Sequence, residues 1–246
     1  KMFRLLQGDV GTGKTIVALM SILMSIDNGF QSALMAPTAV LAFQHYRSIK
    51  EYCKNLNLNV SLLTGATKSS KKKQIIKELS TGQIDIIIGT HALIEDNILF
   101  KNLGLVIIDE QHKFGVAQRA KLSKKSILSP HVIVLTATPI PRTLAMTFYG
   151  DLDVSIIDEL PPGRKEIKTV HKFDKDKEGV LSFIREKLEL GQQAYIIYPL
   201  IEESEKLDYK NLLSGFNYLS KYFLRYGFVV SMLHGKMKND EKNQQM

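Results

Sequence analysis

The sequence contains very little cysteine and no long apolar run. Cys53 is the single cysteine among 246 residues, so no internal disulfide can form. This usage fits a reducing compartment, and we assign Cys53 no chemical role because no catalytic partner accompanies it. No apolar run approaches the roughly 18 residues of a membrane span, and the N-terminus lacks a basic leader followed by an apolar stretch. We therefore expect a cytoplasmic protein with no membrane association.

Acidic residues are also in deficit. The chain has 33 Lys and Arg residues against 25 Asp and Glu, which gives a formal net charge of +8. Such an excess favours a polyanionic partner such as nucleic acid, although charge alone does not locate a binding site. No short-period repeat is present, and low complexity is confined to the lysine-rich stretch Lys68–Gln74.

Short apolar runs rich in β-branched residues alternate with longer amphipathic ones. Because these runs are apolar throughout, they are typical of strands buried on both faces of a parallel sheet. Alternation with helical patterns predicts an α/β protein whose mostly parallel sheet carries helices on both faces. The predicted strands are Phe3–Leu6, Ser32–Ala36, Val60–Leu63, Asp85–Gly89, Leu105–Asp109, Val132–Thr136 and Val154–Asp158.

The segment "DELPPGRKE", Asp158–Glu166, interrupts this alternation with two prolines and a glycine. We interpret it as a linker near Pro161–Arg164, with one domain over residues 1–162 and another over residues 163–246. The second series is too short for a complete domain. Because the chain begins directly before a strand and ends within a helical pattern, we expect a piece of a larger protein. In this second series we predict strands at Ile167–Phe173, Gln193–Leu200 and Phe228–Gly235 and a helix at Lys177–Leu190.

The stretch "GDVGTGKT" follows the first predicted strand and precedes the helical run "IVALMSILMSI". It satisfies the pattern G-x-x-x-x-G-K-[ST] in the strand-to-helix context that a phosphate-binding loop requires. Glycines allow backbone N–H groups to face phosphate oxygens, and the helix N-terminus adds a partial positive charge. Lys14 would then neutralise the β- and γ-phosphates while the Thr15 hydroxyl binds Mg²⁺. The predicted nucleotide-binding residues are Gly8, Asp9, Val10, Gly11, Thr12, Gly13, Lys14 and Thr15.

Two carboxylates end the predicted strand Leu105–Asp109. Asp109 should reach the carboxyl edge of the sheet, where open α/β sheets bind ligands, and hold Mg²⁺ there. The adjacent Glu110 is positioned to accept a proton from an attacking water. A GTP-binding protein would need a guanine-specifying N-K-x-D, which this chain lacks. The pattern therefore favours ATP with Mg²⁺ as the cofactors.

Several motifs downstream of the loop resemble the motor of superfamily 2 helicases. These are "APTAVLAFQHY", "GTHAL", "DEQH" and "TATPIPRT". More narrowly, "VIIDEQHKFGVAQR", "IDELPPGR", "LIEESE" and "LHGKMK" look like the RecG-type family of branched-DNA helicases, with the resemblance running from Gly8 to about Lys238. The alternative is the transcription-repair coupling factor family, which shares "TATPIPRT". Gln111, Pro161–Arg164 and Ile201–Glu205 favour the RecG type.

The resemblance implies roles for residues outside the nucleotide loop. His112 joins Lys14 and Glu110 as a catalytic residue. Thr136, Thr138 and Arg142 couple hydrolysis to movement, and Thr136 and Thr138 are expected within reach of Glu110 and His112. Loops that follow a phosphate backbone without base readout would bind DNA. The residues implied for DNA binding are Pro37, Thr38, Gln44, Thr64, Gly65, Thr90, His91, His234 and Gly235.

The fold and function so implied are a RecA-like P-loop NTPase domain, the beginning of a second RecA-like domain, and an ATP-dependent translocase. We expect its partner to be branched double-stranded DNA at stalled forks and Holliday junctions, and the protein to be a monomer. By itself the chain should bind ATP weakly, hydrolyse it very slowly and unwind nothing. An RNA-remodelling ATPase and a nucleotide-gated binding module without hydrolysis remain alternatives. Additional salt-sensitive affinity is expected from Lys68, Lys71, Lys72, Lys73 and Lys77, unless they are only solvated surface.

Overall fold

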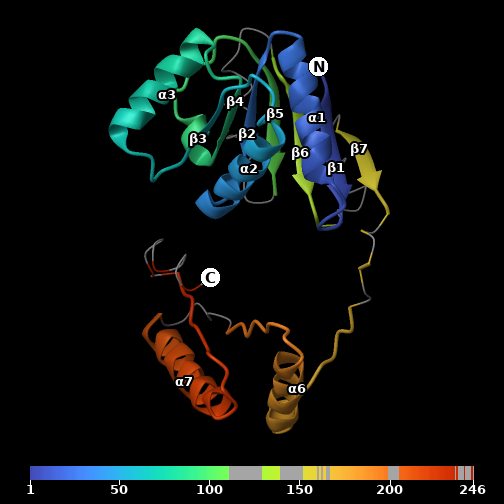
Figure 1. Ribbon diagram of the computed structural model, residues 1–246, viewed down its shortest axis with the longest axis vertical. Coiled ribbons are helices and arrows are strands. Elements are labelled where there is room, and N and C mark those ends of the chain that lie inside the picture. The colour runs from blue at the N-terminus through green and yellow to red at the C-terminus, as the bar shows by residue number, and fades with distance from the viewer. Residues whose placement is uncertain are drawn as a thin grey trace. The chain divides into compact units, whose positions relative to one another are not determined.

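The computed structural model describes most of the chain (Figure 1). The described residues are 1–110, 129–138, 152–159, 161, 163–164, 167–198, 205–235, 237, 241 and 245, with the backbone alone for 205–211. They divide into two compact units, Lys1–Lys165 and Glu166–Met246.

Seven parallel strands form the sheet of the first unit, in the order β3-β4-β2-β5-β6-β1-β7. All seven strands predicted for this unit are present, and the parallel arrangement is confirmed. The strands are β1 Phe3–Gly8, β2 Gln31–Met35, β3 Val60–Leu63, β4 Ile86–Gly89, β5 Leu103–Asp109, β6 His131–Thr136 and β7 Asp153–Ile157.

Apolar side chains cover both faces of this sheet because successive residues of a strand point to opposite sides. In β2, Ala33 and Met35 join one buried cluster, and Leu34 joins the other. In β5, Val106 and Ile108 face the first cluster, while Leu105 and Ile107 face the second. A strand of this kind must be apolar at every position, which is why the runs were recognisable in the sequence.

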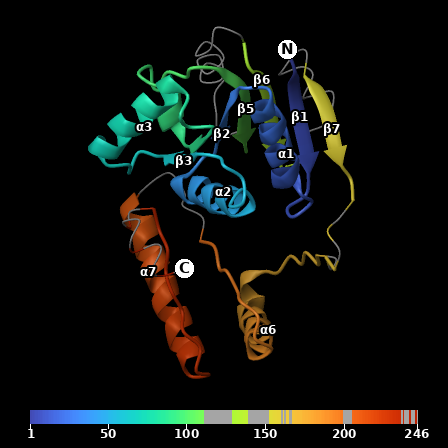
Figure 2. The ribbon, with the colours of Figure 1, turned by 45° about the horizontal axis from the view of Figure 1, so that its top comes forward.

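Helices close both clusters. Helices α1 (Lys14–Asp27) and α2 (Ala39–Tyr52) pack against the face that contains Leu34, and α3 (Ser69–Thr81) packs against the other face (Figures 1 and 2). Thr38 caps the N-terminus of α2, where its hydroxyl accepts a hydrogen bond from the Leu41 N–H at 3.3 Å. A short 3₁₀ helix, η1 (His91–Ile94), follows β4.

The carboxyl ends of the strands lie nearly in line across the sheet. Gln7 of β1 pairs with Thr136 of β6, and Asp109 of β5 pairs with Leu135, which also belongs to β6. On the other half of the sheet, Gly89 of β4 is opposite both Met35 and Leu63. The residues that follow these strands therefore gather along one edge, although they come from distant parts of the sequence.

Gly89 is a position where the fold requires glycine. A Cβ added there would lie 2.2 Å from the Leu63 carbonyl oxygen and 3.0 Å from Leu93 Cγ. Because β3 is held in the sheet by its ladder with β4, that carbonyl cannot retreat without breaking hydrogen bonds. We expect Gly89→Ala to lower the free energy of unfolding by about 3 kcal/mol or more, measured by urea denaturation.

Gly65 provides the matched control for this substitution. A Cβ there meets nothing within 4 Å, so Gly65→Ala should unfold at the urea concentration of the unsubstituted chain, within error. Equal midpoints for the two variants would contradict the close approach of β3 and β4.

The second unit contains η3 (Asp174–Asp176), α6 (Lys177–Glu189) and α7 (Glu205–Leu224). Leu181 of α6 packs with Leu219 and Phe223 of α7 in a small buried cluster. The helix predicted at Lys177–Leu190 is confirmed by α6. The three predicted strands are absent from residues 167–173, 193–198 and 228–235, which are described without a strand. An apolar run becomes a strand only where a neighbouring ladder pairs its N–H and C=O groups, and no such ladder is present among these residues.

The structure separates the units after Lys165, whereas the linker pattern predicted a domain boundary after Pro162. That domain assignment stays a prediction. None of the described helices is long and apolar enough to span a membrane. Cys53 is buried in the cluster that contains Leu34, and burial raises the pKa of its thiol, which accords with a packing role.

Candidate nucleotide and nucleic-acid site

The predicted phosphate loop connects β1 to α1. Gly8 ends β1, and Gly13 precedes α1 in a left-handed conformation with φ of 91°. Gly11 also has a positive φ, of 84°, so the loop places two glycines where other residues would be strained. Thr15 is the second residue of α1. The strand, glycine-rich turn and helix N-terminus that the motif requires are therefore all present.

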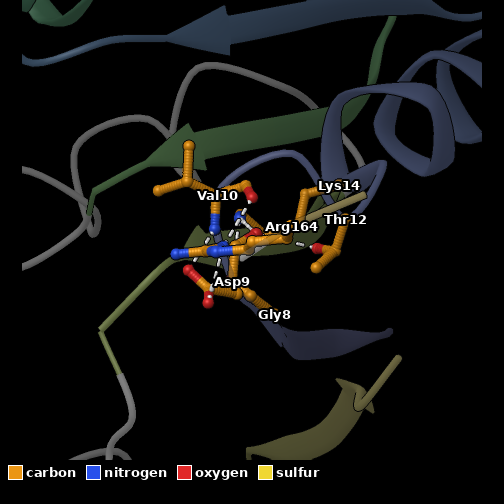
Figure 3. Close-up of polar contacts among 6 residues, drawn as sticks. All are labelled: Gly8, Asp9, Val10, Thr12, Lys14 and Arg164. Atoms are coloured by element: carbon orange, nitrogen blue, oxygen red, sulfur yellow. Dashed lines mark hydrogen bonds and ion pairs between the residues drawn. The ribbon is translucent and has the colours of Figure 1, made fainter. Parts of the chain in front are cut away.

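Lys14 is held by the loop itself. Its ammonium donates hydrogen bonds to the carbonyl oxygens of Gly8 at 2.8 Å and Asp9 at 2.7 Å (Figure 3). The Thr12 hydroxyl donates to the same Asp9 carbonyl at 2.9 Å. Bonds from an ammonium to phosphate oxygens are stronger than bonds to neutral carbonyls, so a bound phosphate could draw Lys14 away from them.

Asp9 is the acidic residue of the loop. One carboxylate oxygen accepts a hydrogen bond from the Val10 N–H at 2.6 Å, and the other lies 2.6 Å from Nη1 of Arg164. The Val10 N–H and then the Arg164 guanidinium lower the pKa of the Asp9 carboxyl. Arg164 also donates to the Val10 carbonyl oxygen at 3.1 Å (Figure 3). Sequence reasoning placed Arg164 only in the linker and gave it no contact with this loop.

Asp109 ends β5 as predicted, but β6 lies between β5 and β1 in the sheet. Asp109 therefore reaches the predicted edge of the sheet two strands away from the phosphate loop. Oδ2 of Asp109 is 2.8 Å from Nε2 of His45, a residue of α2. The two side chains are 14% and 12% exposed, respectively. An ionised carboxylate only accepts hydrogen bonds, so the His45 tautomer with a hydrogen on Nε2 is the one that donates to it.

Glu110 has an unusual backbone. Its φ of 50° makes it the one non-glycine residue with a positive φ among the described residues. Its carboxylate accepts a hydrogen bond from the Ala137 N–H at 3.3 Å, and its own N–H donates to the Leu135 carbonyl at 3.0 Å. Both partners belong to β6 or the residues directly after it. Glu110 is therefore held by the end of β6 and the residue that follows it.

The predicted coupling residues begin at the end of β6. Thr136 is buried, with an exposed fraction of 2%. Its hydroxyl accepts a hydrogen bond from the Thr138 N–H at 3.1 Å, which shapes the turn. We expected the hydroxyls of Thr136 and Thr138 to reach Glu110. The hydrogen bond to Glu110 described above comes instead from the backbone N–H of Ala137, the residue between these two threonines.

The predicted DNA-binding residues of the first unit follow β2, β3 and β4. Pro37 and Thr38 come after β2, Thr64 and Gly65 after β3, and Thr90 and His91 after β4. Gln44 is exposed on α2. Since these three strands are neighbours, the residues lie along one half of the sheet edge, and the phosphate loop, Glu110 and Thr136 lie along the other half. His45 of α2 joins the two halves through Asp109.

Some predicted residues lie elsewhere. His112 and Arg142 fall outside the described residues, as do Gln111 and most of "LIEESE". His234 and Gly235 belong to the second unit, in a turn where the Met237 N–H donates to the His234 carbonyl at 3.2 Å. Of the lysines considered for DNA binding, Lys72 forms an ion pair with Glu95 at 2.6 Å. The roles assigned to all these residues stay predictions.

The side chains expected to hold Mg²⁺ have suitable chemistry. Mg²⁺ prefers a few oxygen ligands and keeps several waters when it binds together with phosphates. Asp109 offers a carboxylate and Thr15 a hydroxyl at the same edge of the sheet. Among the described residues no group of three or more His, Cys, Asp and Glu side chains forms a dedicated metal site.

The DEAD/DEAH box helicase family matches residues 3–147, more than half of the sequence. The chain belongs to the DEAD/DEAH box helicase family. Within that family it is 53% identical over 242 residues to the ATP-dependent DNA helicase RecG of Aquifex aeolicus, covering 98% of this chain and 30% of that protein. The RecG of Bacillus subtilis is 50% identical over 246 residues, covering 100% of this chain and 36% of the relative.

Solved structures give the same picture of a helicase fold. The structure of RecG bound to a three-way DNA junction is 46% identical, with a TM-score of 0.75, and the match covers 99% of this chain and 31% of that one. This similarity confirms the expected RecA-like α/β helicase fold. Yeast Dbp5 bound to RNA and ADP BeF3 is 18% identical with a TM-score of 0.65, which shows a common fold alone. This DEAD/DEAH box helicase chain thus spans about a third of the length of the RecG relatives it matches.

Proposed function

We propose that this chain is the ATP-binding part of a RecG-type DNA helicase that remodels branched double-stranded DNA. The observation that carries the proposal is the sheet edge itself. Lys14 follows β1, Glu110 follows β5, and Thr136 ends β6, the strand between them. The candidate DNA-binding loops follow the three neighbouring strands. A protein with this arrangement can sense a nucleotide and a DNA backbone at one edge. The sequence identity to RecG proteins supports DNA rather than RNA as the partner.

ATP would bind with its phosphates over the N-terminus of α1. The backbone N–H groups of the loop and Lys14 would bind the β- and γ-phosphates, and Glu110 would accept the proton of the attacking water. Thr15 and Asp109 would hold Mg²⁺, whose positive charge would offset the negative charge that develops on the phosphates. The Ala137 N–H holds the Glu110 carboxylate, so it fixes the direction from which that proton is taken.

His45 would act as a positioning residue for Asp109. Without its ring the Asp109 carboxylate loses the partner 2.8 Å away and can rotate. We expect His45→Ala to raise the Mg²⁺ concentration needed for half-maximal binding of a fluorescent ADP by about tenfold. His45→Gln, which retains a donor, should recover part of this loss. His131→Ala is the control, because His131 begins β6 at the opposite end of the strand from Thr136. Identical Mg²⁺ titrations for His45→Ala and His131→Ala would remove His45 from this role.

The proposal is tested by binding and hydrolysis. The chain should bind ADP and ATP in the presence of Mg²⁺, run as a monomer in sedimentation, hydrolyse ATP very slowly and fail to unwind a fork. A chain extended to the length of the RecG relatives should hydrolyse ATP faster with a three-way DNA junction than with single-stranded RNA. Stronger stimulation by RNA would favour an RNA-remodelling ATPase instead. Rapid fork-stimulated hydrolysis by the 246-residue chain would contradict the expected weakness of this portion.

A further inference from the structure

Two residues that follow β7, Pro161 and Arg164, contact the phosphate loop. Strand β7 pairs in parallel with β1, and its last residue, Ile157, lies opposite Gly8. Residues that follow β7 therefore emerge at the same edge as the loop. A Cβ added to Gly11 would lie 3.2 Å from Cγ of Pro161, so this proline packs on the middle of the loop. Arg164 then contacts Asp9 and Val10, which places two residues of one segment on three consecutive loop residues.

Asp9 introduces an electrostatic problem at this position. A carboxylate in a loop that receives a polyphosphate repels the ligand unless a positive charge offsets it. Lys14 cannot neutralise the Asp9 carboxylate as well, because its ammonium contacts backbone oxygens and is the expected phosphate ligand. Arg164 provides the missing charge, 2.6 Å from Oδ2 of Asp9, while the Val10 N–H occupies the other oxygen. The pair is only partly exposed, with 28% of Arg164 and 39% of Asp9 accessible, so solvent screens it incompletely.

We propose that Arg164 is a positioning residue of the nucleotide site, which neutralises Asp9 and thereby makes nucleotide affinity depend on where the segment after β7 is docked. The inference rests on the nucleotide site proposed above. Arg164 directly precedes Lys165, the last residue of the first unit. By linkage, a nucleotide that binds better when Arg164 is docked must also favour docking of this segment by the same factor.

The test is a double-substitution cycle on the 246-residue chain, with binding of fluorescent ADP as the measurement. Arg164→Ala should weaken ADP binding by about fivefold, because an uncompensated carboxylate then faces the phosphates. Asp9→Asn alone removes the repelling carboxylate and leaves the Arg164 charge unopposed, so it should bind ADP more tightly than the unsubstituted chain. The double variant Asp9→Asn, Arg164→Ala should recover most of the lost affinity, since no charge is left to offset. Adenosine, which lacks phosphates, should bind all four proteins equally.

Further variants separate this role from packing and folding. Arg164→Gln keeps a hydrogen-bond donor without the charge and should bind ADP about fivefold more weakly than the unsubstituted chain. This result can be measured even if Arg164→Ala folds poorly. Arg225→Ala removes the same charge from the second unit and should leave ADP affinity unchanged. Undiminished ADP binding by Arg164→Gln overturns the inference, as does a double variant that stays weak, which would mean that Arg164 acts on phosphate directly. If the unsubstituted chain binds no nucleotide at all, the inference is overturned together with the proposed function.

Discussion

Replacing Lys14 by alanine is expected to weaken nucleotide binding by about 100-fold, or about 2.7 kcal/mol. The estimate follows from the loss of one or two charge-assisted hydrogen bonds to phosphate, each worth about 1.5–3 kcal/mol. Lys14 is well placed for this effect, because its ammonium is already turned into the loop between β1 and α1. Fluorescence titration with an ADP analogue, or calorimetry with ATP and Mg²⁺, measures it directly.

The loop also loses two internal hydrogen bonds in this variant, so its folding must be measured separately. Lys73→Ala on α3 is the matched control, because it removes the same charge from an exposed lysine of the first unit. Both variants should keep the circular dichroism of the unsubstituted chain. If Lys14→Ala binds ATP as tightly as Lys73→Ala, the loop is not a phosphate site and its glycines have only a structural role.

The sequence predicted every strand of the first unit because both faces of that sheet are covered. At Ile86, Ile87 and Ile88 each side chain enters one of the two buried clusters, so no polar residue interrupts the apolar run. The phosphate loop was equally clear, since its glycines are required by local backbone geometry. In the second unit similar apolar runs failed as predictors. Val229 is 89% exposed and Ile197 is 87% exposed. An apolar run of this kind is buried only where it pairs with neighbouring strands of a covered sheet.

The contacts missed from the sequence are those made across the fold. His45 and Asp109 are 64 positions apart in the sequence, and Arg164 and Val10 are 154 positions apart. Short sequence motifs cannot predict contacts between residues so far apart. Strand order decides these contacts. With β6 inserted between β1 and β5, Glu110 meets the backbone after β6, and α2 delivers His45 to Asp109. Gln31 is similar: its buried side chain accepts from the Lys101 N–H and donates to the Ile84 carbonyl, which joins the start of β2 to the residues before β4 and β5.

Replacing Glu110 by glutamine is expected to abolish hydrolysis while leaving nucleotide affinity within about threefold. A general base typically contributes about 10²–10⁴-fold to the rate, and the amide cannot accept the proton of the attacking water. Glutamine retains an oxygen that can accept the bond from the Ala137 N–H, so the side chain at position 110 should keep this contact. Because the chain alone should turn over slowly, the rate is best measured in single-turnover experiments, with protein in excess over labelled ATP.

Glu78→Gln on α3 makes the same change of charge and shape at a half-buried position outside the candidate site and should leave the rate unaltered. The pair of variants also decides between the motor and a nucleotide-gated switch. A motor retains ATP binding and loses a measurable rate at Glu110, whereas a switch has no rate above the uncatalysed background in either protein. Equal, measurable hydrolysis by both variants would assign the base to another residue. The left-handed backbone at Glu110 would then serve only to turn the chain toward Ala137.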